Sequence, residues 1–384
     1  MRFEFATATR IIFGAGTISE ASPAAKEFGR QALVTTGRDA TRAKRLLDGL
    51  RELEVRAVPF AVEGEPDLEV VQRGVALARQ ERCDLVIGFG GGSALDAGKA
   101  IAAMLTNDGD VLDYLEVIGG GKTLSRPSAP FIAIPTTAGT GSEVTRNAVL
   151  ASPEHRVKVS LRSPLMLPKV ALVDPELTWD LPPALTASTG LDALTQLIEP
   201  YVSGRATPMT DGLCVEGIGR AARALRAAFE NGRNAAARED MAMASLFGGL
   251  ALANAGLGAV HGLAGVIGGM FDAPHGAICA ALLPRVMAAN LAALRTRESA
   301  NRAIRRYVAV GRLLTGRTDA QANDGVEWVG RLVSDLQIPK LGTYGLKSGH
   351  IADLVEKSKN ASSMKANPIV LTSEELAAVV ESAL

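Results

Sequence analysis

The first half of this 384-residue chain alternates short apolar runs with longer amphipathic stretches, and this alternation constrains the fold more than any other feature. Short apolar runs predict buried strands, whereas apolar residues spaced three or four apart predict helices. Strands separated by single helices imply a parallel sheet with right-handed crossovers. The predicted strands are residues 31–36, 55–60, 83–92, 131–137 and 170–175, and the predicted helices are residues 40–53, 67–80 and 93–107.

The sequence pattern changes in the second half of the chain, because the strand-like runs stop near residue 180. The stretch LPPALTAST, which contains two prolines, marks this change and indicates a break. Beyond it, stretches rich in Ala, Leu and Gly follow the 3.6-residue period of a helix. These predicted helices are residues 208–230, 240–258, 277–294, 300–314 and 322–336. We therefore expect an α/β nucleotide-binding domain with a parallel sheet over residues 1–180 and an all-α domain over residues 181–384.

Charge and composition exclude several classes of function. Lys and Arg together number 41, as do Asp and Glu, so we expect binding to neither nucleic acid nor an anionic membrane. No apolar run reaches the roughly 18 residues of a membrane span, and the N-terminus lacks the pattern of a signal peptide. The three cysteines, Cys83, Cys214 and Cys279, are scattered and suggest no disulfide framework, which favours a cytoplasmic location.

A glycine-rich turn follows the predicted strand 83–92. The segment GFGGGSALDAGKA, residues 88–100, leads through this turn into a helix with Ser93 as its predicted N-cap. Glycines let backbone amides approach a ligand, and a helix N-terminus favours an anion such as a dinucleotide pyrophosphate. A tight turn without a ligand is the alternative. A second loop, PTTAGTGSEVT at 135–145, also follows a strand, so both loops would meet at the carboxyl edge of the sheet, where open α/β folds bind ligands.

Candidate metal ligands occur in the predicted helical domain. Asp192 and Gln196 stand four residues apart in a helix predicted to open after Gly190, a spacing that places both on one face. His261 lies in a helical stretch of small residues, and His275 follows Ala-Pro and is predicted to begin the next helix. A carboxylate with two imidazoles suits Fe²⁺ or Zn²⁺, and Gln196 could add a weaker amide oxygen. Buried, hydrogen-bonded histidines without a metal are the alternative interpretation.

Taken together, the motifs resemble those of the iron-containing alcohol dehydrogenases, often called type III. They occur in the family's order from about residue 10 to residue 384, and their combination is far more specific than any one of them. The matching segments are GGGSALDAGKA, FIAIPTTAGTGSEVT, VALVDPELT, LPP…TGLDALTQLIEPYVS, GLGAVHGLAG, PHGAICAALLP and NPIVLTSEEL.

The resemblance implies a dehydroquinate-synthase-like fold, in which an α/β nucleotide-binding domain precedes a helical domain that carries the metal. It implies hydride transfer between NAD or NADP and an alcohol or aldehyde, assisted by Fe²⁺ or alternatively Zn²⁺. The implied cofactor-binding residues are Gly91, Gly92 and Ser93 at the pyrophosphate, Asp96 in the same helix, Thr136, Thr137 and Thr140 at the ribose and phosphates, and Lys158 near the nicotinamide ribose. The implied metal ligands are Asp192, Gln196, His261 and His275, and the implied catalytic residues are Asp192, His261 and His275.

The chain departs from the family's pattern at two positions. Gln196 stands where the family normally has a histidine ligand. Gly265 stands where many members have a second histidine, four residues after His261, which lies near the nicotinamide and can relay a proton. Three interpretations remain open: a metal site with a glutamine ligand, a metal-independent reductase of the maleylacetate-reductase kind, or a catalytically impaired binding protein.

The choice of cofactor depends on the residues after the predicted strand 31–36. NAD-binding proteins usually place an acidic residue there to accept the ribose 2′-hydroxyl, and the matching family aspartate aligns with Gly37. Gly37 leaves room for a 2′-phosphate and Arg38 can pair with it, which favours NADP, although a small loop shift would bring in the carboxylate of Asp39. The apolar helical domain suits a small alcohol or aldehyde. By analogy we expect a homodimer, since the strand-like N-terminus could extend a partner's sheet.

Overall fold

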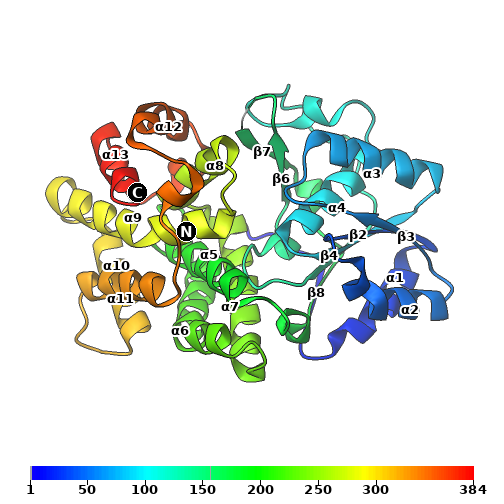
Figure 1. The fold of residues 1–384 in the computed structure, drawn as a ribbon, viewed down its shortest axis with the longest axis horizontal. Coiled ribbons are helices and arrows are strands. Elements are labelled where there is room, and N and C mark those ends of the chain that lie inside the picture. The colour runs from blue at the N-terminus through cyan, green and yellow to red at the C-terminus, as the bar shows by residue number, and fades with distance from the viewer. Residues whose placement is uncertain (1, 156) are drawn as a thin grey trace. The chain divides into compact units, whose positions relative to one another are not determined.

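The computed structural model describes residues 2–155 and 157–384. By its internal contacts the chain divides into two compact units (Figure 1). One, which we call the α/β unit, comprises Ala6–Thr137 and Gly141–Thr178. The other, the helical unit, comprises Trp179–Leu384 together with Ala138–Thr140 and a terminal segment that ends at Phe5.

A parallel sheet forms the centre of the α/β unit. Its strands are β1 (Arg10–Phe13), β2 (Gln31–Thr36), β3 (Arg56–Ala61), β4 (Leu85–Gly90), β5 (Phe131–Pro135) and β8 (Val170–Val173), in the order β1-β8-β5-β4-β2-β3. Every pair of neighbours in this sheet runs parallel, so the predicted parallel sheet is confirmed. The registers bring Thr36 beside Phe89 and Gly90 beside Pro135. The carboxyl ends of β2, β4 and β5 therefore lie side by side.

Helices cover both faces of this sheet (Figure 1). They are α1 (Ala21–Phe28), α2 (Lys44–Glu52), α3 (Leu68–Gln80) and α4 (Gly92–Thr106). Successive side chains of a strand point to opposite faces: Leu33 packs in the cluster that includes α3 and α4, whereas Ala32 and Val34 pack in the cluster that includes α1 and α2. The chain runs outward from β2 to β3 on one side and from β4 to β5 on the other. The strand order thus reverses between β2 and β4, and such a reversal opens a crevice at the carboxyl ends.

The structure contains a hairpin that sequence analysis did not anticipate. Strands β6 (Asn147–Ser152) and β7 (Val157–Arg162) pair antiparallel and form a second, two-stranded sheet. Burial alternates along β6, as expected for a strand with one covered face, but its residues, NAVLAS, do not alternate between polar and apolar types. The helix predicted over 40–53 also differs: a 3-10 turn spans Ala40–Ala43 before α2 begins at Lys44.

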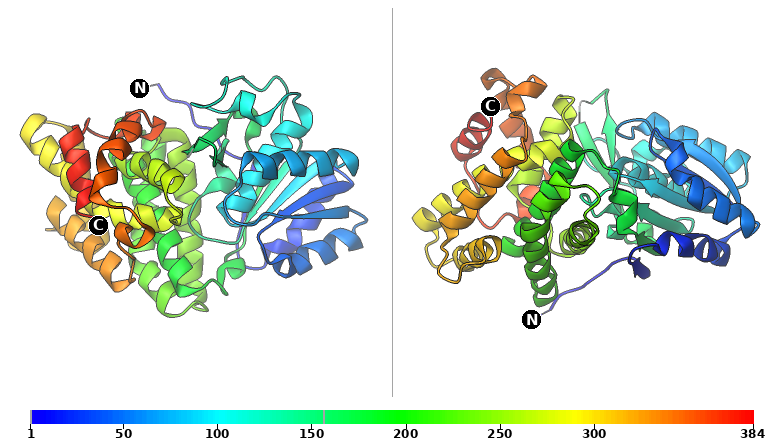
Figure 2. Two further views of the ribbon diagram at one scale, coloured as in Figure 1. Left: turned by 45° about the horizontal axis from the view of Figure 1, so that its top comes forward. Right: turned by 60° about the horizontal axis from the view of Figure 1, so that its bottom comes forward.

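The helical unit contains no strand anywhere in residues 179–384, and Figure 2 shows its helices from two further directions. The predicted all-α domain is therefore confirmed. Its helices are α5 (Pro183–Val202), α6 (Pro208–Glu230), α7 (Ala235–Ala255), α8 (Ala259–Met270), α9 (His275–Arg297), α10 (Arg302–Thr315), α11 (Ala322–Asp335), α12 (Ile351–Lys359) and α13 (Ser373–Glu381).

Helix α5 begins earlier than the sequence pattern suggested. We expected a break through LPPALTAST and a helix opening after Gly190, but the helix starts at Pro183. The reason is that proline is well suited to the first turn of a helix, where its missing N–H costs nothing and its φ is already helical. Asp192 and Gln196 therefore lie in the middle of a long, buried helix, which holds their positions firmly.

Helix α9 is long and apolar enough, by length and composition, to cross a membrane, with a mean hydropathy of 1.7. However, 78% of that window is buried inside the protein, as in a core helix. The pair α7 and α8 passes the same test only if it is joined across a 99° bend. No other helix in the described part of the chain does so.

Candidate metal centre and nucleotide cradle

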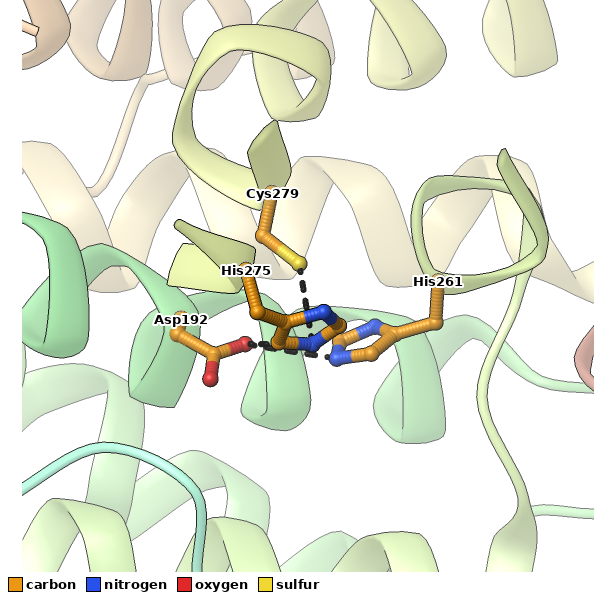
Figure 3. A group of neighbouring side chains, drawn as sticks. All are labelled: Asp192, His261, His275 and Cys279. Carbon is orange, nitrogen blue, oxygen red and sulfur yellow. Dashed lines mark hydrogen bonds and ion pairs between the residues drawn. The ribbon is translucent and has the colours of Figure 1, made fainter. Parts of the chain in front are cut away.

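Four side chains from three helices of the helical unit gather at one point (Figure 3). Asp192 comes from the middle of α5, His261 from α8, and His275 and Cys279 from the first turns of α9. One ligand atom of each lies within 4.8 Å of the corresponding atoms of the other three. The structure thus brings together three of the residues singled out in the sequence and adds Cys279, which the sequence analysis had treated only as a scattered cysteine.

The distances within this cluster suit a metal ion. Asp192 Oδ1 lies 3.3 Å from His261 Nε2 and 3.9 Å from His275 Nε2, and Cys279 Sγ lies 3.5 Å from His275 Nε2. Donors arranged tetrahedrally around Zn²⁺ at its usual bond lengths are about 3.3–3.7 Å apart. The spacing of the described side chains therefore already approximates that of a ligand set.

Three buried polar atoms of this region have no hydrogen-bond partner among the described residues: Asp192 Oδ1, Gln196 Oε1 and His261 Nε2. Buried donors and acceptors are almost always satisfied, so a group of orphans calls for an explanation. Gln196 lies one turn after Asp192 on α5 and packs beside Gly248 of α7, where an added Cβ would lie 3.2 Å from the Gln196 Cβ. A cation in the cluster would satisfy Asp192 Oδ1 and His261 Nε2, so the residues fit a bound divalent metal.

Glu199 holds His261 from the side opposite the cluster. Its Oε2 lies 2.7 Å from His261 Nδ1, and its Oε1 accepts a hydrogen bond of 2.7 Å from the Val260 amide. A carboxylate on Nδ1 requires Nδ1 to carry the proton, which leaves the Nε2 lone pair free for a metal. Glu199 is not among the residues that the sequence motifs single out. The signal was its position seven residues after Asp192, two helical turns along the same face of α5.

The charges of the cluster shift its pKa values. Burial opposes the ionisation of Asp192, but the nearby charges of His275 and His261 outweigh burial and lower the pKa of that carboxyl. Burial also opposes the protonation of His275, yet the charges of Cys279 and Asp192 raise its pKa to about 9. The pKa of His261 is raised well above its ordinary value, because Cys279, Asp192 and Glu199 overcome its burial. Surroundings that attract a proton this strongly also attract a cation.

Gly265 lies one turn after His261 on α8. A Cβ added to it would meet nothing within 4 Å, so the space beside it is open. The described residues thus place no side chain where many family members are expected to have a second histidine.

The α/β unit forms a glycine-lined cradle where β2, β4 and β5 end. Gly91 is the N-cap of α4, and a Cβ added to it would lie 3.3 Å from Thr137 Cγ2. A Cβ on Gly90 would lie 2.6 Å from the Ala94 Cβ and 3.4 Å from the Gly37 amide nitrogen. The backbone at these strand ends therefore carries no side chains at Gly90 and Gly91, and neighbouring segments pack closely against it. The amides at the N-terminus of α4 suit a phosphate.

The predicted N-cap role of Ser93 is wrong. Helix α4 begins at Gly92, so Ser93 lies in the first turn, and Gly91 has the extended backbone of the cap. Glycine is tolerated at this position, and the close approach of Thr137 favours it. Thr136 sits at the same edge, with its amide donating a 2.8 Å hydrogen bond to the Gly90 carbonyl.

Other residues singled out in the sequence have protein partners. Asp96 accepts hydrogen bonds from the Ser142 hydroxyl at 2.5 Å and from the Val149 amide at 3.0 Å. Lys158 Nζ lies 3.2 Å from Glu65 Oε1. Thr140 groups with the helical unit rather than with Thr136 and Thr137.

Of the side chains that follow β2, Asp39 is hydrogen-bonded within the protein, whereas Arg38 is exposed. The Asp39 carboxylate accepts a 3.0 Å hydrogen bond from the Thr41 amide and so caps the 3-10 turn that follows. The Arg38 side chain is exposed, and a Cβ on Gly37 would meet no atom of the described residues within 4 Å. A carboxylate engaged in capping is less available to a ribose hydroxyl, whereas Arg38 and the space at Gly37 lie open.

A buried lysine that no sequence motif singles out organises the second loop. Lys99 is 1% exposed, and its Nζ donates to the Ser142 carbonyl, the Thr145 hydroxyl and the Asn147 carbonyl at 2.7–3.0 Å. Burial lowers the pKa of Lys99, while the charges of Asp96 and Glu143 work against that shift. This ammonium ties α4 to the segment that runs from the loop into β6.

Comparison with known proteins places the chain among dehydrogenases. Residues 8–175 match the family described as iron-containing alcohol dehydrogenase, and residues 186–384 match the C-terminal domain of that family. A 1,3-propanediol dehydrogenase of Klebsiella pneumoniae is 39% identical over 366 residues, which cover 92% of each chain. The solved structure of an alcohol dehydrogenase from Oenococcus oeni has a TM-score of 0.92 at 33% identity and covers 100% of both chains.

A sulfoacetaldehyde reductase from Bifidobacterium kashiwanohense, solved in complex with NAD⁺, has a TM-score of 0.86 at 28% identity and covers 100% of this chain and 99% of its own. The chain belongs to the iron-containing alcohol dehydrogenase family, a family of oxidoreductases. The resemblance seen in the sequence motifs is thereby confirmed, as is the fold that it implied.

Proposed function

We propose that this protein is a metal-assisted, NAD(P)-dependent dehydrogenase that interconverts a small alcohol and its aldehyde. The observation that carries the proposal is the convergence of Asp192, His261 and His275, where the first two have buried ligand atoms with no hydrogen-bond partner among residues 2–155 and 157–384. The proposed ligands are Asp192, Gln196, His261 and His275. The same orphaned atoms favour a metal-dependent enzyme over a metal-independent reductase or a binding protein, neither of which explains them.

A divalent cation held there supplies Lewis-acid chemistry, and a nicotinamide supplies the hydride chemistry. The protein's own contribution is position and charge. Glu199 fixes the His261 ring with Nε2 free, and the long helix α5 holds Asp192 in place. The open space at Gly265 admits a water where a side chain would otherwise stand, so water or a ribose hydroxyl carries the alcohol proton away.

The cradle at Gly91, Gly92 and Ser93 is the proposed pyrophosphate site, with Thr136 and Thr137 beside it. The roles proposed for Thr140 and Lys158 rest on the resemblance alone, and Asp96 supports the loop from within. We infer a preference for NADP, supported by the exposed Arg38, the open space at Gly37 and the capping role of Asp39.

We also propose a homodimer in the cytoplasm. Strand β1 is an edge strand of the parallel sheet, so one of its sides is available to another chain. The described cysteines are all free, which suits a reducing compartment. Light scattering on the purified protein measures the oligomeric state directly, and a monomer would contradict the dimer.

The enzymatic proposal is tested by metal analysis of the purified protein, paired with a panel of alcohols and aldehydes assayed with NADPH and NADH. The panel includes 1,3-propanediol, because a relative of this chain carries that name. We expect about one metal ion per chain, turnover with small primary alcohols, and a lower KM for NADPH. The His261→Ala variant should lose both metal and turnover. If His261→Ala keeps full activity in the presence of a chelator, the metal role is wrong.

A further inference from the structure

Cys279 is the member of the metal cluster that the proposed function does not use. It lies four residues after His275, one turn along α9, and is fully buried. Figure 3 shows its side chain directed into the cluster. Its Sγ lies 3.5 Å from His275 Nε2 and within 4.8 Å of the ligand atoms of Asp192 and His261.

A second observation supports a role for the cysteine, because two buried polar atoms of the same cluster lack hydrogen-bond partners among the described residues. Asp192 Oδ1 and His261 Nε2 are buried, lack hydrogen-bond partners among the described residues, and belong to the same cluster. A thiol that only hydrogen-bonds to His275 Nε2 would leave both atoms unsatisfied. A cation shared by the four side chains would satisfy both and would take the sulfur as a donor.

The donor set indicates which metal fits. Gln196 offers an amide oxygen, which is a weaker donor than an imidazole, whereas a thiolate is a strong and soft one. Two imidazoles, one carboxylate and one thiolate are all ordinary ligands of Zn²⁺, and a catalytic zinc shell can expand to five donors, which leaves a position for the substrate oxygen. Without Cys279, the remaining set has no soft donor and would discriminate less between Zn²⁺ and a hard ion such as Mn²⁺.

We propose that Cys279 supplies a further, thiolate ligand to the metal centre and tunes it to Zn²⁺, so that the site keeps its metal even when Gln196 is replaced. The inference rests on the proposed function, since it names a further ligand of the same site. On binding, the thiol S–H bond breaks, a metal–sulfur bond forms, and one proton passes to the solvent.

Cobalt(II) is the probe that tests the ligand, because a Co²⁺–thiolate bond adds a charge-transfer absorption in the near ultraviolet that nitrogen and oxygen ligands lack. The chelator-stripped full chain is titrated with Co²⁺ as wild type, Cys279→Ser, Gln196→Ala and Cys214→Ser. Cys214 is the matched control, since it is a free and fully buried cysteine of the same unit but lies outside the cluster. We expect the band in wild type, Gln196→Ala and Cys214→Ser, and its loss in Cys279→Ser while Co²⁺ still binds.

Affinity gives a second readout. Loss of a residue that merely orients a ligand costs about 10–100-fold in metal affinity, so loss of a ligand itself should cost at least as much. We expect Cys279→Ser to weaken Zn²⁺ binding by at least about tenfold and Mn²⁺ binding much less. Circular dichroism of each variant verifies that the fold is intact.

The outcomes separate the two proposals. If wild type binds Co²⁺ in a His261-dependent manner but shows no thiolate band, or if Cys279→Ser keeps the band, the inference about Cys279 is overturned and the metal centre stands. The inference is equally overturned if Cys279→Ser weakens Zn²⁺ and Mn²⁺ alike. If wild type binds Zn²⁺ and Co²⁺ no better than His261→Ala does, the metal centre of the proposed function fails, and the inference fails with it.

Discussion

Nδ1 of His261 lies 2.7 Å from Oε2 of Glu199, with both side chains buried in the helical unit. The contact joins α8 to α5 and fixes both the tautomer and the orientation of the ring. It also positions Nε2 3.3 Å from Asp192 Oδ1. One carboxylate of α5 thus orients the histidine, and another carboxylate of the same helix shares its proposed metal.

Replacing this carboxylate should weaken metal binding without removing a ligand. Glu199→Gln keeps the shape of the side chain but removes the charge that holds the Nδ1 proton. We expect metal affinity to fall about 10–100-fold, measured by competition with a chelator of known affinity. Glu216→Gln is the control, because Glu216 is an exposed residue paired with Arg220. An unchanged affinity in Glu199→Gln would show that His261 needs no such partner.

The cofactor cradle should be sensitive to a single methyl group. In Gly91→Ala the new Cβ would lie 3.3 Å from Thr137 Cγ2 and would crowd the amides at the start of α4. Loss of one good hydrogen bond to a charged phosphate costs about 1.5–3 kcal/mol, so the KM for the cofactor should rise about 10–100-fold. Metal content should not change. Gly212→Ala is the control, because a Cβ there meets nothing within 4 Å; equal KM values for the two variants would contradict the cradle.

The proposed preference for NADPH should depend on Arg38. In Arg38→Ala we expect the KM for NADPH to rise about tenfold, as befits a charge-assisted hydrogen bond at an exposed site, and the KM for NADH to stay within about twofold. Arg51→Ala, which removes another exposed arginine near Asp48, should alter neither. If the wild-type protein uses NADH better than NADPH, the preference for NADP is wrong, and Asp39 becomes the candidate acceptor for the ribose 2′-hydroxyl.

Glu143 should make stability depend on pH. Burial raises the pKa of this carboxyl to about 7, even though Lys99 nearby lowers it, while in the unfolded chain the pKa is near 4.5. The folded state therefore holds a proton that the unfolded state has already released, so this contribution is complete below about pH 4.5 and is lost as the pH rises through 7. The loss is about 3 kcal/mol.

Glu143→Gln isolates this effect, because all other titrating groups are shared with wild type. We expect the variant to gain stability relative to wild type between pH 5 and pH 8, followed as the difference in thermal unfolding midpoints. Glu116→Gln, at an exposed site paired with Arg162, should show no such trend. A constant difference between Glu143→Gln and wild type across this range would mean that Glu143 titrates normally in the folded protein.

Local patterns in the sequence predicted most elements closely. Strand β2 and helix α6 have the predicted bounds, because an apolar run and a 3.6-residue period depend only on nearby residues. The errors have local causes too. Prolines that suggested a break instead begin α5, and β6 was not predicted because its residues, NAVLAS, lack the alternation that its burial shows.

Less of the candidate site could be predicted from such local patterns. Asp192, His261 and His275 could be named from their chemistry and from the resemblance, yet nothing in their spacing says that three helices meet. Glu199, Lys99 and Cys279 were missed, because a glutamate, a lysine and a cysteine within helices look ordinary until their neighbours are known.

By itself, the sequence determined the order of strands and helices, the change from an α/β to a helical region, and membership of a dehydrogenase family, because these follow from short-range periodicity and from motifs read in order. Only the tertiary structure decided which side chains share a site. A ligand set depends on distances of a few ångströms between α5, α8 and α9, and those distances arise from packing between helices that are remote in the chain. The same packing buries Cys279 beside His275 and leaves Asp192 Oδ1 without a hydrogen-bond partner in the described part of the chain.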